Sequence, residues 1–210
     1  MSDLEYYESM KYQEFLLSSV RKEICQPNVI FENLKINKVE NLVDFGVGLG
    51  FFIPYFFKYL PKESWVWTAD YQQDLIDLLL QKKIKEEIDR FTPFYIDKSD
   101  HPILPDWVPT PDLIFSSMCL STFADPGLAM DGLIRSMKQG GRLIVVDWVK
   151  VEYKHGGPLL KDKISLDKKK FLAEEYKLKI VKTLRVSEFV YAMELTAGSE
   201  FVYGIYEMRD

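Results

Sequence analysis

The stretch that most constrains the fold is LVDFGVGLGFF, at residues 42–52. Gly46, Gly48 and Gly50 occupy every second position after an acidic residue, Asp44, with an apolar run before them and an aromatic-rich segment after them. Glycine permits positive φ and lets the backbone approach a ligand without a Cβ in the way. A helix that begins at such a turn directs its free amides at the ligand. We therefore expect a strand that turns sharply into a helix at a nucleotide-binding loop.

Hydrophobic periodicity predicts alternating strands and helices along the rest of the chain. Strands are expected at 41–45, 64–70, 91–96, 112–118, 140–148, 178–185 and 200–208, and helices at 8 to about 35 with a break near Pro27, 51–60, 72–88, 127–138 and 166–176. Pro93 predicts that its strand lies at a sheet edge or carries a bulge, and the run 187–195 fits either a strand or a helix. This alternation indicates a parallel sheet with helices on both faces and ligands beyond the carboxyl ends of the strands.

Length and composition argue against several classes of function. A chain of 210 residues, 47% apolar and 28% charged, is most simply one domain. Its net charge of -5 is unlike the basic footprint of nucleic-acid binding, and the run DKKKF at 167–171 is interpreted as a solvated helix face. The N-terminus has no secretion-signal pattern and no stretch is long enough for a membrane span, so we expect a cytoplasmic protein.

The thiols and imidazoles do not form a metal-binding pattern. Cys25 and Cys119 are far apart, and neither they nor His101 and His155 show a spacing typical of zinc sites. We therefore expect no metal. Cys119 lies in an apolar run, which predicts a buried free thiol.

The glycine turn does not have the dinucleotide-binding pattern G-x-G-x-x-G/A, whose last small residue lets the helix pack closely on the strand. Counting from Gly46 puts Phe51 at that position, and counting from Gly48 puts Ile53 there. The mismatch in both registers argues against a nicotinamide-dependent oxidoreductase.

The segment VDFGVGLG instead resembles motif I of the class I S-adenosylmethionine-dependent methyltransferases, acid-x-Gly-x-Gly-x-Gly, with matches at Asp44, Gly46, Gly48 and Gly50. Asp70 ends the second predicted strand, where this family keeps an acid that binds both ribose hydroxyls. A carboxylate suits that role because it only accepts hydrogen bonds and can take two donors at once.

The resemblance implies further contacts with the cofactor. An acid in the loop after the third strand is expected to reach the adenine amino group, and either Asp100 or Asp97 matches that position. The other cofactor-binding residues implied are Tyr71, His101, Ser117 and Met118, the last two near the methionine end.

Residues 40 to 150 as a whole are similar to the type 11 methyltransferases, which include the ubiquinone and menaquinone C-methyltransferases, and in particular to small stand-alone prokaryotic members. The segments ILPDWVPTPDLIFSSMCLSTFADP and GLIRSMKQGGRLIVVDW carry this part of the resemblance. The implied fold is α/β and Rossmann-like: a seven-stranded, mostly parallel sheet with helices on both faces and an antiparallel C-terminal strand. The single domain 1–210 would comprise a helical lid (1–38), a cofactor-binding core (39–148) and a substrate-side loop with C-terminal strands (149–210).

The catalytic residues are unknown from sequence. Many relatives carry a histidine shortly after the fourth strand, where this chain has Ser121, and serine is a poor base without an activator. Asp147, at the end of the fifth strand, is either an orienting or basic group or only the acid that ends a strand. We therefore expect an acceptor with a self-activating nucleophile, such as a carbanion, thiolate or amine.

Taken together, these features predict methyl transfer from S-adenosylmethionine, with S-adenosylhomocysteine as product, to a small-molecule acceptor that the sequence does not identify. Candidates for the acceptor pocket are Tyr7, Tyr12, Ser121, Trp148 and His155. A homodimer is possible. The alternatives are a non-catalytic S-adenosylmethionine-binding module and, less favoured by the sequence, a nicotinamide-dependent oxidoreductase.

Overall fold

The computed structural model describes residues 15, 16 and 18–201. Tyr7 and Tyr12 lie outside the described residues, as does the predicted helix before residue 15 and the predicted strand after residue 201.

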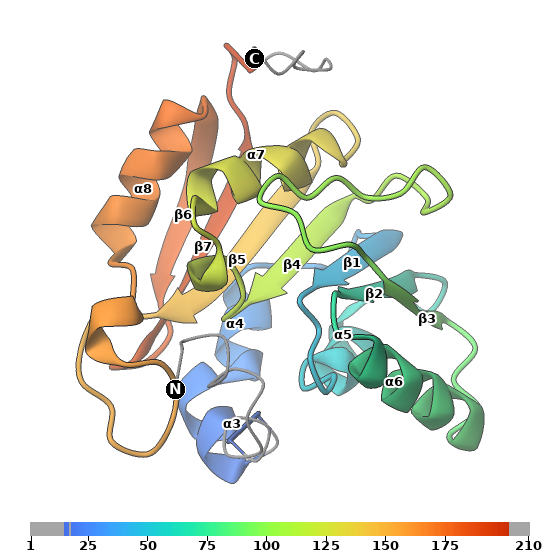
Figure 1. Cartoon of the computed structure of the whole chain (residues 1–210). Helices are drawn as coiled ribbons and strands as arrows, with labels where there is room; N and C mark the ends of the chain where they lie inside the picture. Colours follow the sequence, from blue (N-terminus) through green and yellow to red (C-terminus); the bar gives the residue numbers. More distant parts are fainter. Residues whose placement is uncertain (1–14, 17, 202–210) are drawn as a thin grey trace.

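The core of the molecule is a seven-stranded sheet with the order β3-β2-β1-β4-β5-β7-β6 (Figure 1). β3, β2, β1, β4 and β5 pair with one another in parallel, and β7 is antiparallel to both β5 and β6. The predicted mixed, mostly parallel sheet is therefore confirmed. The strands are β1 Asn41–Phe45, β2 Trp65–Asp70, β3 Phe91–Tyr95, β4 Leu113–Ser117, β5 Arg142–Trp148, β6 Leu178–Arg185 and β7 Val190–Ala197.

The last strand of the described residues is β7, at a place where the prediction left the structure open. The run 187–195, which fits either a helix or a strand, forms β7 from Val190, while residues 199–201 are not in a strand. β7 lies between β5 and β6, so most of its residues are buried on both faces and its side chains show no alternation. Its one buried acid, Glu194, is paired with Arg142 of β5 at 3.0 Å.

Helices cover both faces of the sheet, as predicted. Successive side chains of a strand point to opposite faces of the sheet, and those of β5 meet different helices. Ile144 and Val146 pack in the apolar cluster with α3, α4 and α5, whereas Leu143 and Val145 pack in the cluster with α7 and α8. None of the helices in the described chain is long and apolar enough to cross a membrane. They are α3 Ser19–Cys25, α4 Pro27–Asn33, α5 Ile53–Tyr59, α6 Gln73–Lys85, α7 Pro126–Arg135 and α8 Leu166–Glu175, with short 3₁₀ turns η1 Leu120–Thr122 and η2 Leu160–Asp162.

Two proline predictions are confirmed. The N-terminal helical run breaks before Pro27, because Gln26 adopts a left-handed conformation (φ 39°) that ends α3 and Pro27 then opens α4. Pro93 lies in β3, the edge strand beside β2, where a residue without an N–H is tolerated.

The interpretation of DKKKF as a solvated helix face is wrong for one of its lysines. Lys169 is fully buried, its ammonium forms an ion pair with the buried Asp147 at the end of β5, and it donates a hydrogen bond to Ser121 Oγ at 3.0 Å. Lys169, Leu172 and Ala173 share the inner face of α8 because they are three and four residues apart. A buried cation therefore ties α8 to the carboxyl end of the sheet.

Lys169→Met is expected to lower the free energy of unfolding by about 3–5 kcal/mol, because Asp147 is then left as a buried charge without its partner. Lys168→Met, at the preceding and exposed position of α8, is the matched control and should change the free energy of unfolding by less than about 0.5 kcal/mol. Urea denaturation of the three proteins measures both effects. A loss below about 1 kcal/mol for Lys169→Met would show that the ion pair does not hold α8 in place.

Candidate functional site

A cavity opens beyond the carboxyl ends of β1, β2, β3 and β4, and together with its mouth it encloses about 1140 Å³. This is where an open parallel sheet is expected to bind ligands. Most of the predicted cofactor-binding residues line it: Gly46, Gly48, Asp70, Tyr71, Asp100, Ser117 and Met118. Asp44, Gly50 and His101 do not.

The glycine turn is held against the end of the neighbouring strand. The backbone amides of Gly46 and Val47 donate to the Ala69 carbonyl of β2, at 2.9 and 3.1 Å. All three glycines of the motif have positive φ, +75° at Gly46, +54° at Gly48 and +76° at Gly50. A Cβ at Gly50 would collide with Ile53 of α5 rather than enter the cavity, so the third glycine serves the packing of the helix.

Asp70 joins this turn to the start of α6. Its Oδ2 accepts from the Gly48 amide at 2.9 Å and its Oδ1 accepts from the Gln72 amide at 3.1 Å. Burial raises the pKa of this carboxyl above its ordinary value, while these backbone hydrogen bonds oppose the rise. A carboxylate has about four acceptor sites, so Asp70 retains capacity for hydroxyl donors inside the cavity.

Asp44 lies beneath the turn and is almost completely buried. Burial raises the pKa of Asp44 to about 8; the nearby Arg21 lowers it and Asp70 raises it further. The first acid of the motif is thus part of the support of the turn and not of the cavity wall.

Arg21 of α3 lines the cavity and was not among the predicted site residues. It is buried; its Nη1 donates to the Leu16 carbonyl at 3.2 Å, and its guanidinium lies 4.5 Å from the centre of the Phe51 ring. Among the described residues, its Nε has no hydrogen-bond partner. A signal was present in the sequence, because Arg21 shares a helix face with Ile24 and Cys25, where an apolar residue is expected.

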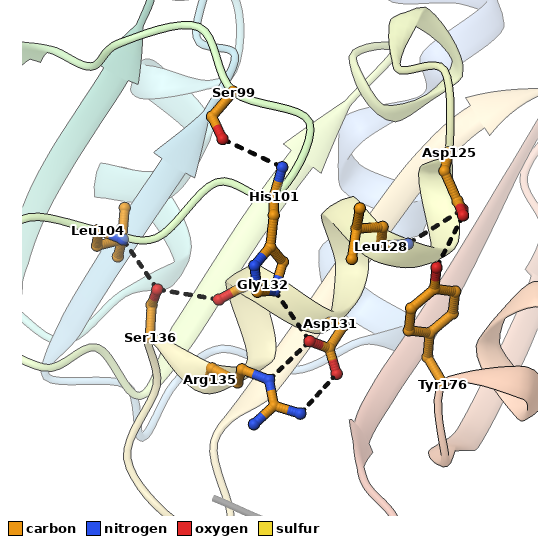
Figure 2. A network of polar contacts seen from close by, with 10 residues as sticks. All are labelled: Ser99, His101, Leu104, Asp125, Leu128, Asp131, Gly132, Arg135, Ser136 and Tyr176. Atoms are coloured by element: carbon orange, nitrogen blue, oxygen red, sulfur yellow. Dashed lines mark hydrogen bonds and ion pairs between the residues drawn. The ribbon is translucent and has the colours of Figure 1, made fainter. Parts of the chain in front are cut away.

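The loop after β3 forms another part of the cavity wall. Asp97 and Asp100 both line the cavity, so either carboxylate can face a bound ligand. His101 is directed elsewhere: its Nε2 lies 3.0 Å from Asp131 Oδ2 on α7 (Figure 2). The structure therefore does not bring His101 to the cavity with the other predicted residues.

The turn after β4 supplies the remaining wall. Met118 has a positive φ of 55°, and its amide donates to the Val146 carbonyl of β5 at 2.7 Å. Ser117 Oγ is buried and has no hydrogen-bond partner in the part of the chain that the structure describes. Cys119 packs beside Gly46, and burial, reinforced by nearby acids, raises the pKa of its thiol, so the thiol stays protonated at neutral pH.

The two candidate catalytic residues bind each other behind this wall. Ser121 Oγ donates to Asp147 Oδ2 at 2.7 Å and accepts from Lys169, while Asp147 Oδ1 accepts from the Trp148 amide at 2.7 Å. Neither Ser121 nor Asp147 lines the cavity. Their polar atoms are occupied by one another and by Lys169, so neither offers a free base to a ligand.

The described candidates for the acceptor pocket lie away from the cavity. Trp148 is buried between Phe15 and Tyr153, with ring centres 5.7 and 5.6 Å away, and His155 is exposed beside Tyr153. Tyr7 and Tyr12 are outside the described residues. In the same described part of the chain, no three His, Cys, Asp or Glu side chains gather as a metal site would require.

Residues 43–145 match the model of the type 11 methyltransferase family, described as a methyltransferase domain. A search of curated proteins gives no match.

Three solved structures show how widely the fold is shared. A SAM-dependent methyltransferase from Aquifex aeolicus is similar with a TM-score of 0.76 and 21% identity, over 88% of this chain and 96% of that one. A putative type 11 methyltransferase from Sulfolobus solfataricus gives 0.60 and 19%, over 89% and 99%. The O-methyltransferase NcsB1 from neocarzinostatin biosynthesis, in complex with S-adenosylhomocysteine and 1,4-dihydroxy-2-naphthoic acid, gives 0.71 and 17%, over 92% and 61%.

At these sequence identities the three structures establish only a common fold. The assignment to a family comes from the match to the family model. The glycine turn, Asp70 and the turn after β4 all lie within the matched segment, each at the end of a strand. Residues 43–145 therefore form a domain of the type 11 family of S-adenosylmethionine-dependent methyltransferases.

Proposed function

We propose that this protein transfers a methyl group from S-adenosylmethionine to a small-molecule acceptor by in-line displacement. The observation that carries the proposal is the position of Asp70, whose carboxylate lines the cavity while the amide of Gly48 holds it against the glycine turn. An acceptor-only group beside a turn of this shape suits a ligand with a vicinal diol, as the ribose of the cofactor has.

The two ends of the cavity differ in the way that the cofactor requires. On the β2–β3 side, Leu75 and Ile96 offer apolar surface and Asp97 and Asp100 offer acceptors, which suits the adenine ring and its amino group. On the side of α3, Arg21 offers a buried cation with a spare N–H. A buried charge needs an opposite charge, and Arg21 would hold the carboxylate of the methionine moiety.

The protein needs to supply little chemistry of its own. When bound, S-adenosylmethionine supplies a sulfonium methyl group that is already electrophilic. The chain would align the acceptor with that group and exclude water, which can lower a barrier by up to about 7–11 kcal/mol in ideal cases.

The reacting end lacks a base among its described residues. At the turn after β4 the cavity is lined by Ser117, Met118, Cys119, Thr122 and Phe123. The only titratable group in this set is the Cys119 thiol, whose raised pKa keeps it protonated. We infer an acceptor that brings its own nucleophile, a carbanion, thiolate or amine.

Calorimetric titration of the purified protein with S-adenosylmethionine, S-adenosylhomocysteine and NAD in parallel tests the cofactor. Micromolar binding of the first two without NAD supports the proposal, and a screen of acceptors with a labelled methyl group then tests transfer. Binding of NAD alone would overturn it. Cofactor binding with no transfer to any acceptor would favour a non-catalytic binding module.

Asp70→Ala is expected to weaken S-adenosylhomocysteine binding by at least about tenfold, the scale of a lost hydrogen bond to a charged group. Asp74→Ala, an exposed acid on the first turn of α6, is the matched control and should bind normally. Calorimetry measures both variants. Unchanged affinity for Asp70→Ala would remove this residue from the ribose site.

Gly48→Val should abolish binding, because it adds a side chain to the cavity wall at a turn that the cofactor must approach closely. Gly140→Val is the control: Gly140 also has a positive φ, +79°, but a Cβ there meets nothing within 4 Å. Both variants carry backbone strain of about 1–3 kcal/mol, visible as a lower Tm, whereas only Gly48→Val should lose S-adenosylhomocysteine. Normal binding by Gly48→Val would make the turn purely structural.

Ser121→Ala is expected to keep at least about a tenth of the transfer rate, because its hydroxyl is engaged by Asp147 and Lys169 and does not act as a base. Removal of a general base costs about 10²–10⁴-fold, so the labelled-methyl assay separates the two roles clearly. A loss on that larger scale would place Ser121 in the reaction.

A further inference from the structure

The loop between β3 and β4 carries one wall of the cavity without secondary structure of its own. Residues 97–104 contain neither helix nor strand, yet Asp97, Ser99, Asp100 and Pro102 line the cavity. Within the described chain, no backbone hydrogen bond joins residues 97–103 to the backbone of another segment. Side-chain contacts must therefore determine where this wall lies.

Those contacts converge on α7 (Figure 2). His101 Nε2 lies 3.0 Å from Asp131 Oδ2, and the Leu104 amide donates to Ser136 Oγ at 2.9 Å. Ser136 Oγ in turn donates to the Gly132 carbonyl at 3.0 Å. Both anchors belong to α7 and its C-cap, and they lie on either side of Gly132 along the chain. Ser136 is four residues beyond Gly132 and therefore lies on the same side of the helix as this glycine.

Gly132 allows the loop to lie directly on the helix. A Cβ at this position would be 2.5 Å from the Pro102 carbonyl oxygen and 2.8 Å from His101 Cδ2. The first of these is a backbone atom, which cannot rotate away. The absence of a side chain at Gly132 is thus what brings His101 within reach of Asp131.

The acceptor of this contact is itself immobilised. Asp131 is buried, and Arg135, one turn further along α7, donates to both of its oxygens, from Nε at 2.6 Å and from Nη2 at 3.1 Å. The helix is also fixed at its start, where the Asp125 carboxylate accepts from the Gly127 and Leu128 amides and from the Tyr176 hydroxyl at 2.7 Å (Figure 2). His101 therefore meets a rigid partner.

We propose that His101 is a positioning residue for recognition of the adenine base: through Asp131, and over Gly132, it holds the loop 97–104 so that Asp97 or Asp100 faces the amino group of the base. This inference rests on the proposed function. It gives His101 a role beside the cofactor site, without contact between the imidazole and the cofactor.

The test compares S-adenosylhomocysteine with S-inosylhomocysteine, which carries an oxygen where adenine has its amino group. The wild type should prefer the adenine compound by at least about tenfold, the scale of one good hydrogen bond to a charged group. His101→Ala should bind S-adenosylhomocysteine about tenfold more weakly and lose most of the preference. His101→Gln, whose amide N–H can still donate to Asp131, should restore both.

Two further variants separate positioning from general damage. Gly132→Val should abolish the preference by a different route, since its side chain pushes the loop off α7. His155→Ala, at the other histidine and on an exposed loop, is the matched control and should behave as wild type. Calorimetry gives the two affinities and thermal denaturation confirms that each variant is folded.

A wild-type preference retained in folded His101→Ala overturns the proposal. An equal loss of affinity for both compounds in His101→Ala also overturns it, because the substitution would then affect the cavity as a whole. A wild type that binds the two compounds equally well overturns it too. Each of these leaves the proposed function standing, since the wild type still binds S-adenosylhomocysteine. A wild type that binds neither compound removes the proposed function and this inference with it.

Discussion

The contact on which the site depends is between the turn after β1 and the last two residues of β2. Two amides of the turn share the Ala69 carbonyl and a third donates to the Asp70 carboxylate. These bonds are possible because β1 and β2 are parallel and in register, with Phe45 opposite Ala69, so both strands end at the same level. The glycine backbone and the acid are thereby joined before any ligand arrives, and the cavity is largely preformed.

Buried charges behind the cavity wall form a second common feature. Lys169 and Asp147 hold Ser121 in the turn after β4, and Arg135 and Asp131 hold His101 in the loop after β3. In both cases a helix at the C-terminal half of the sheet supplies the partner for a loop that lines the cavity. Loops without regular hydrogen bonding are thus given defined positions by ion pairs in low dielectric, where each interaction is strong and costly to break.

These partnerships also decide which groups are left to act. Asp147 and Ser121 are hydrogen-bonded to each other and to Lys169, and the Cys119 thiol stays protonated. The described residues near the reacting end therefore offer no free base or nucleophile. Arg21 of α3 and the acids of the loop after β3 remain among the residues that line the cavity. Such a site binds and orients more readily than it moves protons, in agreement with a reaction in which the cofactor carries the reactive group.

The sequence by itself determined the strand–turn–helix units and the family, because these depend on local patterns. The run NLVDF and the glycines after it define β1 and its turn wherever the chain is placed, and Pro27 and Pro93 mark a helix break and an edge strand through their own geometry. Asp70 was predictable because it ends a strand next to that turn. Only the tertiary structure decided the partners of Lys169, His101 and Arg21, since a local pattern shows at most which face of a helix is buried and not what a side chain meets there. Their burial and pairing arise from residues that are distant in the chain, such as Asp147 and Asp131, and no spacing along a sequence records such a contact.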